Sequence, residues 1–156
     1  MNVVLHPFTG ADAIWLDTWI SPVARSVGYD ALGHADAGQA LLARLRTEKT
    51  LRARVIERDG DAVGVILYRL HAPKRGAAII ELVATPPSAA RLGTGMTAAA
   101  LAEDELRAEK VRRVYAPAPA VHGISMYFWI RLGYRPLLSP EWPCRLEGVA
   151  WLVRDL

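Results

Sequence analysis

Residues 77–96 read AAIIELVATPPSAARLGTGM, and this stretch gives the strongest indication of the fold class. Its first part, Ala77 to Ala84, is an almost continuous apolar run with one charge, Glu81, which is typical of a strand buried on both faces of a sheet. The prolines that follow end the strand, and Gly93 and Gly95 then lead into a helix. A buried strand, a short glycine turn and a helix together indicate a layered α/β domain.

The turn that contains Gly93 and Gly95 is a candidate anion site. A helix start presents unpaired N–H groups and the positive end of the helix dipole. Glycine permits positive φ and lets an anion approach the main chain closely. The alternative is that these glycines only shape a tight turn, because a Gly-x-Gly match by itself has low specificity.

The helix after this turn is predicted to run to about Lys110 with two different faces. Ala98 and Ala102 belong to an apolar stripe at helical spacing, which we expect to pack against the sheet. Glu103 and Arg107 lie on the opposite side, which we expect to face water.

Strand and helix patterns alternate through the rest of the chain. One local pattern predicts a hairpin, in which two β-rich runs, 51–57 and 62–70, flank Asp59 and Gly60. A tryptophan-bearing helix should precede it and stop near Ser21-Pro22. The other predicted elements are strands over 2–5, 111–116, 134–138 and 149–153, and helices over 40–45 and 124–132, the last closed by Gly133. This order predicts an α/β or α+β layered domain with a mixed sheet.

Composition limits the classes of function. A chain of 156 residues, 52% hydrophobic and 22% charged, can bury one core, so we predict a single domain over residues 1–156. Charges interrupt every apolar stretch and no export signal is visible, so we expect no membrane partner and a cytoplasmic location. The lone Cys144 allows neither an internal disulfide nor a multi-thiolate metal site, and we expect no metal. The net charge of +3 is spread among acidic residues, which argues against nucleic acid as a partner.

Residues 81–86 and 90–96 read ELVATP and ARLGTGM, and residues 125–134 read SMYFWIRLGY. These blocks resemble the GNAT superfamily of acyl-CoA-dependent N-acetyltransferases. The first two look like the GNAT strand and its cofactor loop, usually Q/R-x-x-G-x-G/A. The third resembles the closing helix of that family. The sequence departs from the family where Ala90 stands at the head of the loop and where Trp129 replaces a frequent tyrosine.

The resemblance implies a single-domain fold with a central mixed, mostly antiparallel sheet and about four helices. It also implies acetyl-CoA as cosubstrate, with the pyrophosphate on the backbone of the glycine turn and an oxyanion donor near Val83. The residues that would contact the cofactor are Leu82, Val83, Ala84, Arg91, Leu92, Gly93, Thr94, Gly95, Met96 and Trp129.

Glu81 is the candidate general base, acting through water. A carboxylate among apolar neighbours is poorly solvated and therefore accepts a proton more readily. Several GNAT branches use an acidic residue on this strand. The alternative is an ion pair with Arg54 or Arg69 on a neighbouring strand.

The general acid is less clearly marked. Tyr127 is a candidate, although helical spacing places it opposite the face shared by Ser125 and Trp129. His122 is a second candidate, with a helix cap as its structural alternative. Release of the thiolate directly to water is a third route.

The amine acceptor site should lie among the first two helices and their loop. Aromatic and polar groups gather there: Trp15, Trp19, Tyr29, Asp30, His34 and Asp36. We favour a structural role for the tryptophans as core and for the acids as caps.

Three functions stay open at this point. The leading hypothesis is an N-acetyltransferase acting on a primary amine of a small molecule, protein or peptide. The second is an acyl-CoA-binding sensor without turnover, and the third is an unrelated α/β protein. Dimerisation is common in GNAT proteins, but no residue in this sequence demands a homodimer.

Overall fold

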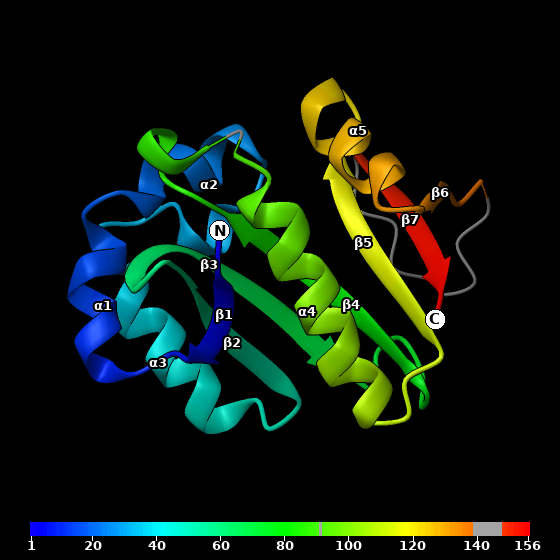
Figure 1. Ribbon diagram of the computed structural model, residues 1–156, viewed down its shortest axis with the longest axis horizontal. Helices are drawn as coiled ribbons and strands as arrows, with labels where there is room; N and C mark the ends of the chain where they lie inside the picture. The colour runs from blue at the N-terminus through cyan, green and yellow to red at the C-terminus, as the bar shows by residue number, and fades with distance from the viewer. Residues whose placement is uncertain (91, 139–147) are drawn as a thin grey trace.

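A computed structural model of the chain describes residues 1–90, 92–138 and 148–156 (Figure 1). Arg91 and Cys144, both considered above, lie outside the described residues. The strands are β1 (Val3–Pro7), β2 (Leu51–Arg58), β3 (Asp61–Leu70), β4 (Ala77–Ala84), β5 (Arg113–Pro119), β6 (Arg135–Pro136) and β7 (Val149–Asp155). The α-helices are α1 (Gly10–Asp17), α2 (Ile20–Ser26), α3 (Ala37–Thr47), α4 (Thr94–Ala108) and α5 (Gly123–Arg131), and short 3-10 turns cover Asp30–Leu32 and Pro87–Ala89.

The described strands form one seven-stranded sheet in the order β1-β2-β3-β4-β5-β7-β6. Every neighbouring pair is antiparallel except β4 and β5, which are parallel. The prediction of a mixed, mostly antiparallel sheet is therefore confirmed. The predicted hairpin is also present, because Asp59 and Gly60 both have the positive φ, 51° and 92°, that its tight turn requires.

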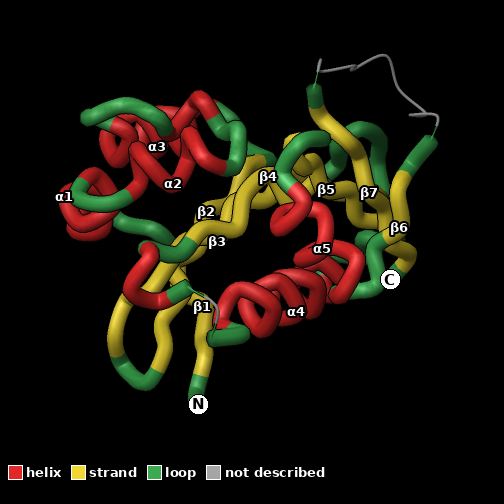
Figure 2. Tube along the Cα trace, turned by 90° about the horizontal axis from the view of Figure 1, so that it is seen from above, coloured by secondary structure: helices red, strands yellow, loops and turns green. Residues whose placement is uncertain are grey.

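Helices cover both faces of the sheet. Figure 2 shows α1, α2 and α3 on one side of it, and α4 and α5 on the other. On β3, Ile66 and Tyr68 join the core under α4, whereas Leu67 between them joins the core under α1 to α3. The period of two along the strand thus produces two separate apolar layers.

Three local predictions need correction. The first helical segment does not stop near Ser21-Pro22: it breaks after Asp17, and α2 then runs through both residues. Pro22 is tolerated because it lies in the first turn of α2, where its missing N–H has no helical acceptor. The strand predicted over 134–138 shrinks to β6, and its Pro136 cannot donate a ladder hydrogen bond.

Glu103 is the third correction, because it does not face water. Its side chain is buried, with 1% of the residue exposed. One oxygen accepts a hydrogen bond from the Tyr134 hydroxyl at 2.8 Å and the other pairs with Arg154 of β7 at 2.7 Å. The two residues cover a side of α4 that the helical pattern alone assigned to solvent.

Among the described residues, no helix combines the length and the apolar character needed to cross a bilayer.

Candidate functional site

The strands β4 and β5 pair over only three residues and then separate. Ala77 to Ile79 pair with Arg113 to Tyr115, after which β5 continues to Pro119 paired with β7 alone. Figure 1 shows the two strands together at one end and diverging toward the other. The two strands therefore separate beyond Ile79 and Tyr115, and a cavity of about 740 Å³ lies between them.

A β-bulge at Glu81 decides which groups reach this cavity. Leu67 of β3 lies opposite Leu82 and Tyr68 opposite Ile80, so Glu81 is the extra residue. The bulge changes the phase of the strand: Ile80 belongs to the core under α4, and Leu82 to the core under α1 to α3. As a result, Glu81 lies on the same side as α2 and α3, and Val83 packs on the α4 side.

The start of α4 offers main-chain donors at one end of the cavity. Gly93 is the N-cap residue with φ of 75°, a left-handed conformation that glycine adopts without strain. The N–H groups of Thr94, Gly95 and Met96 donate to no acceptor among the described residues. Gly93, Gly95 and Met96 line the cavity, so a phosphate at this point would meet free amides and the positive end of the helix dipole.

Bulk at Gly95 would narrow the cavity. A Cβ there would lie 3.3 Å from Phe128 and 3.4 Å from Val83, which is tight on both sides. We call this part of the cavity the α4 half, and its wall consists of Val83, Gly93, Gly95, Met96, Ser125, Phe128 and Trp129.

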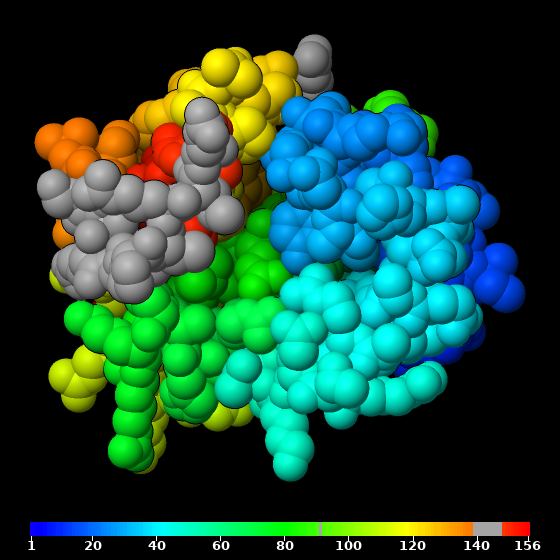
Figure 3. All heavy atoms as spheres, turned by 180° about the vertical axis from the view of Figure 1, so that it is seen from behind, coloured from blue at the N-terminus to red at the C-terminus, as the bar shows by residue number. Residues whose placement is uncertain are grey.

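The other part of the cavity, which we call the α2 half, opens on the far side of the sheet. Its wall consists of Val23, Val27, Gly28, Tyr29, Ile79, Glu81, Pro117, Pro119, Val149 and Trp151. In Figure 3 the blue segment that includes α2 faces the yellow and red segments across a hollow, with green β4 between them. One continuous cavity therefore reaches from the start of α4 to the end of α2.

Glu81 lies in the α2 half, and three side chains hold its carboxylate. Arg69 Nε lies 2.8 Å from Oε1, the Tyr29 hydroxyl donates to Oε2 at 2.9 Å, and Arg44 lies 3.5 Å from Oε2. The ion pair with Arg69 considered above is thus present, whereas Arg54 pairs with Glu105 instead. Burial, followed by the Glu81 charge, raises the pKa of Tyr29 to about 12, so its phenol keeps the proton that it donates.

Tyr29 reaches Glu81 because of the way α2 ends. Gly28 has φ of 74°, and its N–H donates to Arg25 O at 3.2 Å while the Tyr29 N–H donates to Ala24 O at 2.8 Å. These two bonds form a Schellman cap, which turns the chain sharply after the helix. Gly28 also lies against β5, since a Cβ there would meet Pro119 Cγ at 3.0 Å.

These features match a known family. The sequence model of the acetyltransferase (GNAT) family matches residues 13–134. The chain belongs to this family. The activity of the family is acetyl transfer, which makes the chain an acyltransferase. No curated protein sequence matches this acetyltransferase.

Solved GNAT structures share its fold at low sequence identity. The ribosomal-protein-alanine N-acetyltransferase of Brucella melitensis is 21% identical, with a TM-score of 0.74 and coverage of 98% of this chain and 99% of that one. The PaiA N-acetyltransferase of Thermoplasma acidophilum in complex with coenzyme A is 13% identical, with a TM-score of 0.75 and full coverage, 100%, of both chains. The aminoglycoside acetyltransferase AAC(6')-Ib with coenzyme A is 15% identical, with a TM-score of 0.79 and coverage of 99% and 95%. Identities this low compare folds and leave the acceptor of this acetyltransferase open.

Two of the predicted acid candidates lie on α5 at the cavity. His122 is the N-cap of α5, and its Nδ1 accepts a hydrogen bond from the Ser125 N–H at 3.2 Å. Tyr127 is 60% exposed, with the Arg131 guanidinium 5.7 Å from its ring centroid. Both residues line the cavity. The cap considered as the alternative role of His122 is therefore present.

Trp129 occupies the position where the family often has tyrosine. It is 4% exposed, and its ring packs against Phe128 and Tyr134, each with a centroid distance of 4.9 Å. Trp129 therefore forms part of the wall of the α4 half and has no acidic proton near neutral pH.

The other predicted cofactor residues differ in their placement. Leu82, Val83 and Ala84 line the cavity on β4. Thr94 is buried, and its hydroxyl accepts a hydrogen bond from Arg58 at 2.9 Å, while Leu92 is 56% exposed and outside the cavity wall.

The residues predicted around the acceptor separate into two groups. Tyr29 lines the cavity, whereas Trp15 and Trp19 pack edge to face, 5.3 Å between ring centroids, against the core under α1 to α3. The structural role favoured for the tryptophans is thus confirmed. Sequence reasoning missed Arg44 and most of the apolar wall of the α2 half, because no local pattern connects α3 or β7 to β4.

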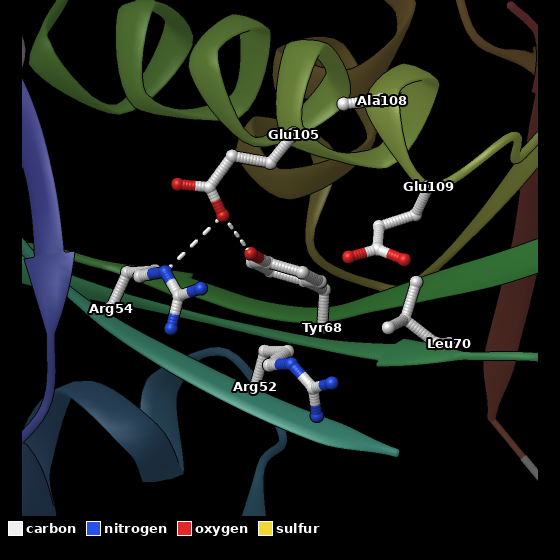
Figure 4. A pocket seen from close by; sticks show the side chains of 7 residues that line it. All are labelled: Arg52, Arg54, Tyr68, Leu70, Glu105, Ala108 and Glu109. Atoms are coloured by element: carbon white, nitrogen blue, oxygen red, sulfur yellow. Dashed lines mark hydrogen bonds and ion pairs between the residues drawn. The ribbon is translucent and has the colours of Figure 1, made fainter.

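A second, smaller cavity of about 220 Å³ lies between α4 and strands β2 and β3. Figure 4 shows Glu105 reaching from α4 toward Arg54 and the Tyr68 hydroxyl, both of which it binds. Arg54, Tyr68 and Glu105 therefore satisfy one another, and none of them lines the larger cavity.

Proposed function

We propose that this chain transfers an acetyl group from acetyl-CoA to a primary amine of a small molecule, protein or peptide. The observation that carries the proposal is the cavity between the separated strands β4 and β5, which begins at the free amides of α4. The amides of Thr94, Gly95 and Met96 would hold the pyrophosphate, and the gap between the strands would admit the thiol-bearing arm. The amine would enter from the α2 half and attack the thioester at the point where both halves meet.

The side chains have distinct roles in this reaction. Glu81 is the one carboxylate among the described residues that line the cavity, and it takes the proton of the amine through water. A backbone N–H near Val83 stabilises the oxyanion as the thioester carbonyl becomes tetrahedral. Tyr127 and His122 are the two side chains from which the departing thiolate can receive its proton.

The glycine turn provides the decisive test. Gly95→Asp places bulk between Phe128 and Val83 and a negative charge beside the pyrophosphate, so we expect it to abolish coenzyme A binding. Ala100→Asp is the matched control, because Ala100 lies on the exposed side of the same helix. Calorimetric titration with coenzyme A measures both, and circular dichroism checks the fold. Equal affinity in the Gly95→Asp variant and the wild type would refute the proposed cofactor site.

A second function is favoured by one residue. Trp129 stands where a proton-donating tyrosine is frequent in the family, which fits a protein that binds acyl-CoA as a sensor without turnover. Thiol release from acetyl-CoA across a panel of amines separates the two functions. The sensor predicts binding of acetyl-CoA and no amine-dependent release.

A further inference from the structure

The one carboxylate on the described wall of the α2 half, Glu81, is neutralised by arginines that lie behind that wall. Both of its oxygens are engaged, Oε1 by Arg69 and Oε2 by Tyr29 and Arg44. Glu48 binds the same two arginines, at 2.8 Å and 2.6 Å. Two arginines and two glutamates cancel one another, so the cluster offers little attraction to additional positive charge.

The wall around this cluster is apolar. It consists of Val23 from α2 and Val27 directly after that helix, Ile79 from β4, Pro117 from β5, and Val149 and Trp151 from β7. Ile79, Val149 and Trp151 belong to one apolar cluster on this face of the sheet. Side chains from four elements thus form a continuous hydrophobic surface beside the expected point of transfer.

These properties discriminate between amines. An acceptor with several ammonium groups would lose the hydration of each group and find no free carboxylate on the described wall. An acceptor with one amine on an apolar body would instead bury that body against valine, isoleucine and tryptophan side chains.

We infer that the acceptor is a primary monoamine carried on an apolar, ring-sized body, and that Val27 helps to select it. The inference rests on the acetyl transfer proposed above. It also sets this acetyltransferase apart from AAC(6')-Ib, which shares its fold and is named for aminoglycosides.

Three amines test the inference directly. Thiol release from saturating acetyl-CoA is measured with 2-phenylethylamine, with ethylamine as the same amine without the ring, and with spermidine as a polycation. We expect kcat/KM for 2-phenylethylamine to exceed that for ethylamine by about 30-fold or more, as burial of a ring predicts. Spermidine should fall below 2-phenylethylamine by at least a similar factor. Equal or better turnover of spermidine would overturn the inference and leave acetyl transfer itself intact.

Two variants test whether Val27 in the wall of the α2 half helps to select the amine. Val27→Asp adds a carboxylate to the α2 half, and we expect kcat/KM for 2-phenylethylamine to fall about 10-fold or more while coenzyme A affinity is kept. Ser26→Asp adds the same charge to an exposed neighbour outside the cavity wall and should change kcat/KM less than about 2-fold. Equal effects of the two variants would contradict a selective role for Val27.

The remaining outcomes distinguish this inference from the proposed function. Calorimetric binding of coenzyme A without transfer to any of the three amines rejects the monoamine acceptor. Absence of coenzyme A binding by the wild-type chain rejects the proposed function instead.

Discussion

The Glu81 carboxylate lies where it could both stabilise the fold and take part in the reaction. It is 16% exposed, it ties β4 to α3 and to the end of α2, and it faces the cavity. A purely structural glutamate would stabilise the fold without affecting the chemistry. A base would have to accept the proton of the amine during each turnover.

Glu81→Gln separates these roles. Glutamine keeps the size and some hydrogen bonds but cannot take a proton, so we expect kcat/KM for the amine to fall about 100-fold or more near pH 7.5. The loss should shrink as the pH rises, since a larger fraction of the amine is then already deprotonated. The measurement is a pH profile of kcat/KM with the preferred amine.

The matched control for this substitution is Glu48→Gln. Glu48 binds Arg44 and Arg69, as Glu81 does, but it lies outside the cavity wall. Its effect on kcat/KM should stay within about 3-fold, although the unfolding temperature falls slightly. If both variants showed the same profile, Glu81 would be a structural residue.

The helices α2 and α5 end in the same way, and each end positions a tyrosine. Gly28 closes α2, and the Schellman pattern recurs at Gly133, where Gly133 N–H donates to Ile130 O and Tyr134 N–H to Trp129 O, both at 3.0 Å. In each case the residue after the glycine is a tyrosine whose hydroxyl binds a glutamate, Glu81 or Glu103. The helix caps therefore position side chains that join the layers of the fold.

Gly28→Ala tests the cap that serves the site. Alanine at φ of 74° is strained, and its Cβ would also press on Pro119 at 3.0 Å. We expect the free energy of unfolding in urea to fall by about 1–2 kcal/mol, and the amine KM to rise as Tyr29 shifts. Gly60→Ala is the control, because Gly60 has φ of 92° with nothing within 4 Å of a Cβ. Equal losses and an unchanged KM would show that the Pro119 contact does not position Tyr29.

The elements were more predictable from the sequence than the contacts between them. The hairpin at Asp59 and Gly60 and the glycine that closes α5 depend on neighbouring residues, so local patterns predicted both. The partners of Glu81 and the burial of Glu103 depend on residues far along the chain, 37 positions away for Arg44 and 51 for Arg154. No helical or strand period carries that information, which is why Arg44 was missed and Glu103 was assigned to water.

Across the part of the molecule that the structure describes, three tyrosine hydroxyls bind glutamates on other elements. Tyr29 binds Glu81, Tyr68 binds Glu105 and Tyr134 binds Glu103. The bonds from Tyr68 and Tyr134 connect α4 to the sheet and to the end of α5. Burial comes first among the causes that raise the pKa of each tyrosine, and the neighbouring carboxylate adds to it.

These raised pKa values predict the loss of stability in alkali. An unfolded tyrosine ionises near pH 10, whereas in the folded chain the pKa of Tyr134 lies well above that value. Because the folded state keeps a proton that the unfolded state has released, its stability is complete below about pH 10 and declines as the pH rises further. Each such tyrosine should contribute a decline of about 1.4 kcal/mol per pH unit.

Tyr134→Phe removes one of these tyrosines. The free energy of unfolding should therefore fall less steeply between pH 10 and 12, by about 1.4 kcal/mol per pH unit. It should also lower stability at pH 7 by about 1–3 kcal/mol, because one oxygen of the buried Glu103 loses its donor. Tyr127→Phe is the control for the loss of a tyrosine hydroxyl as such, because this residue is 60% exposed. Urea unfolding at several pH values from 7 to 12 measures both variants. If the free energy of unfolding fell equally steeply with pH in the wild type and in Tyr134→Phe, the bond to Glu103 would not keep the Tyr134 hydroxyl protonated in the folded chain.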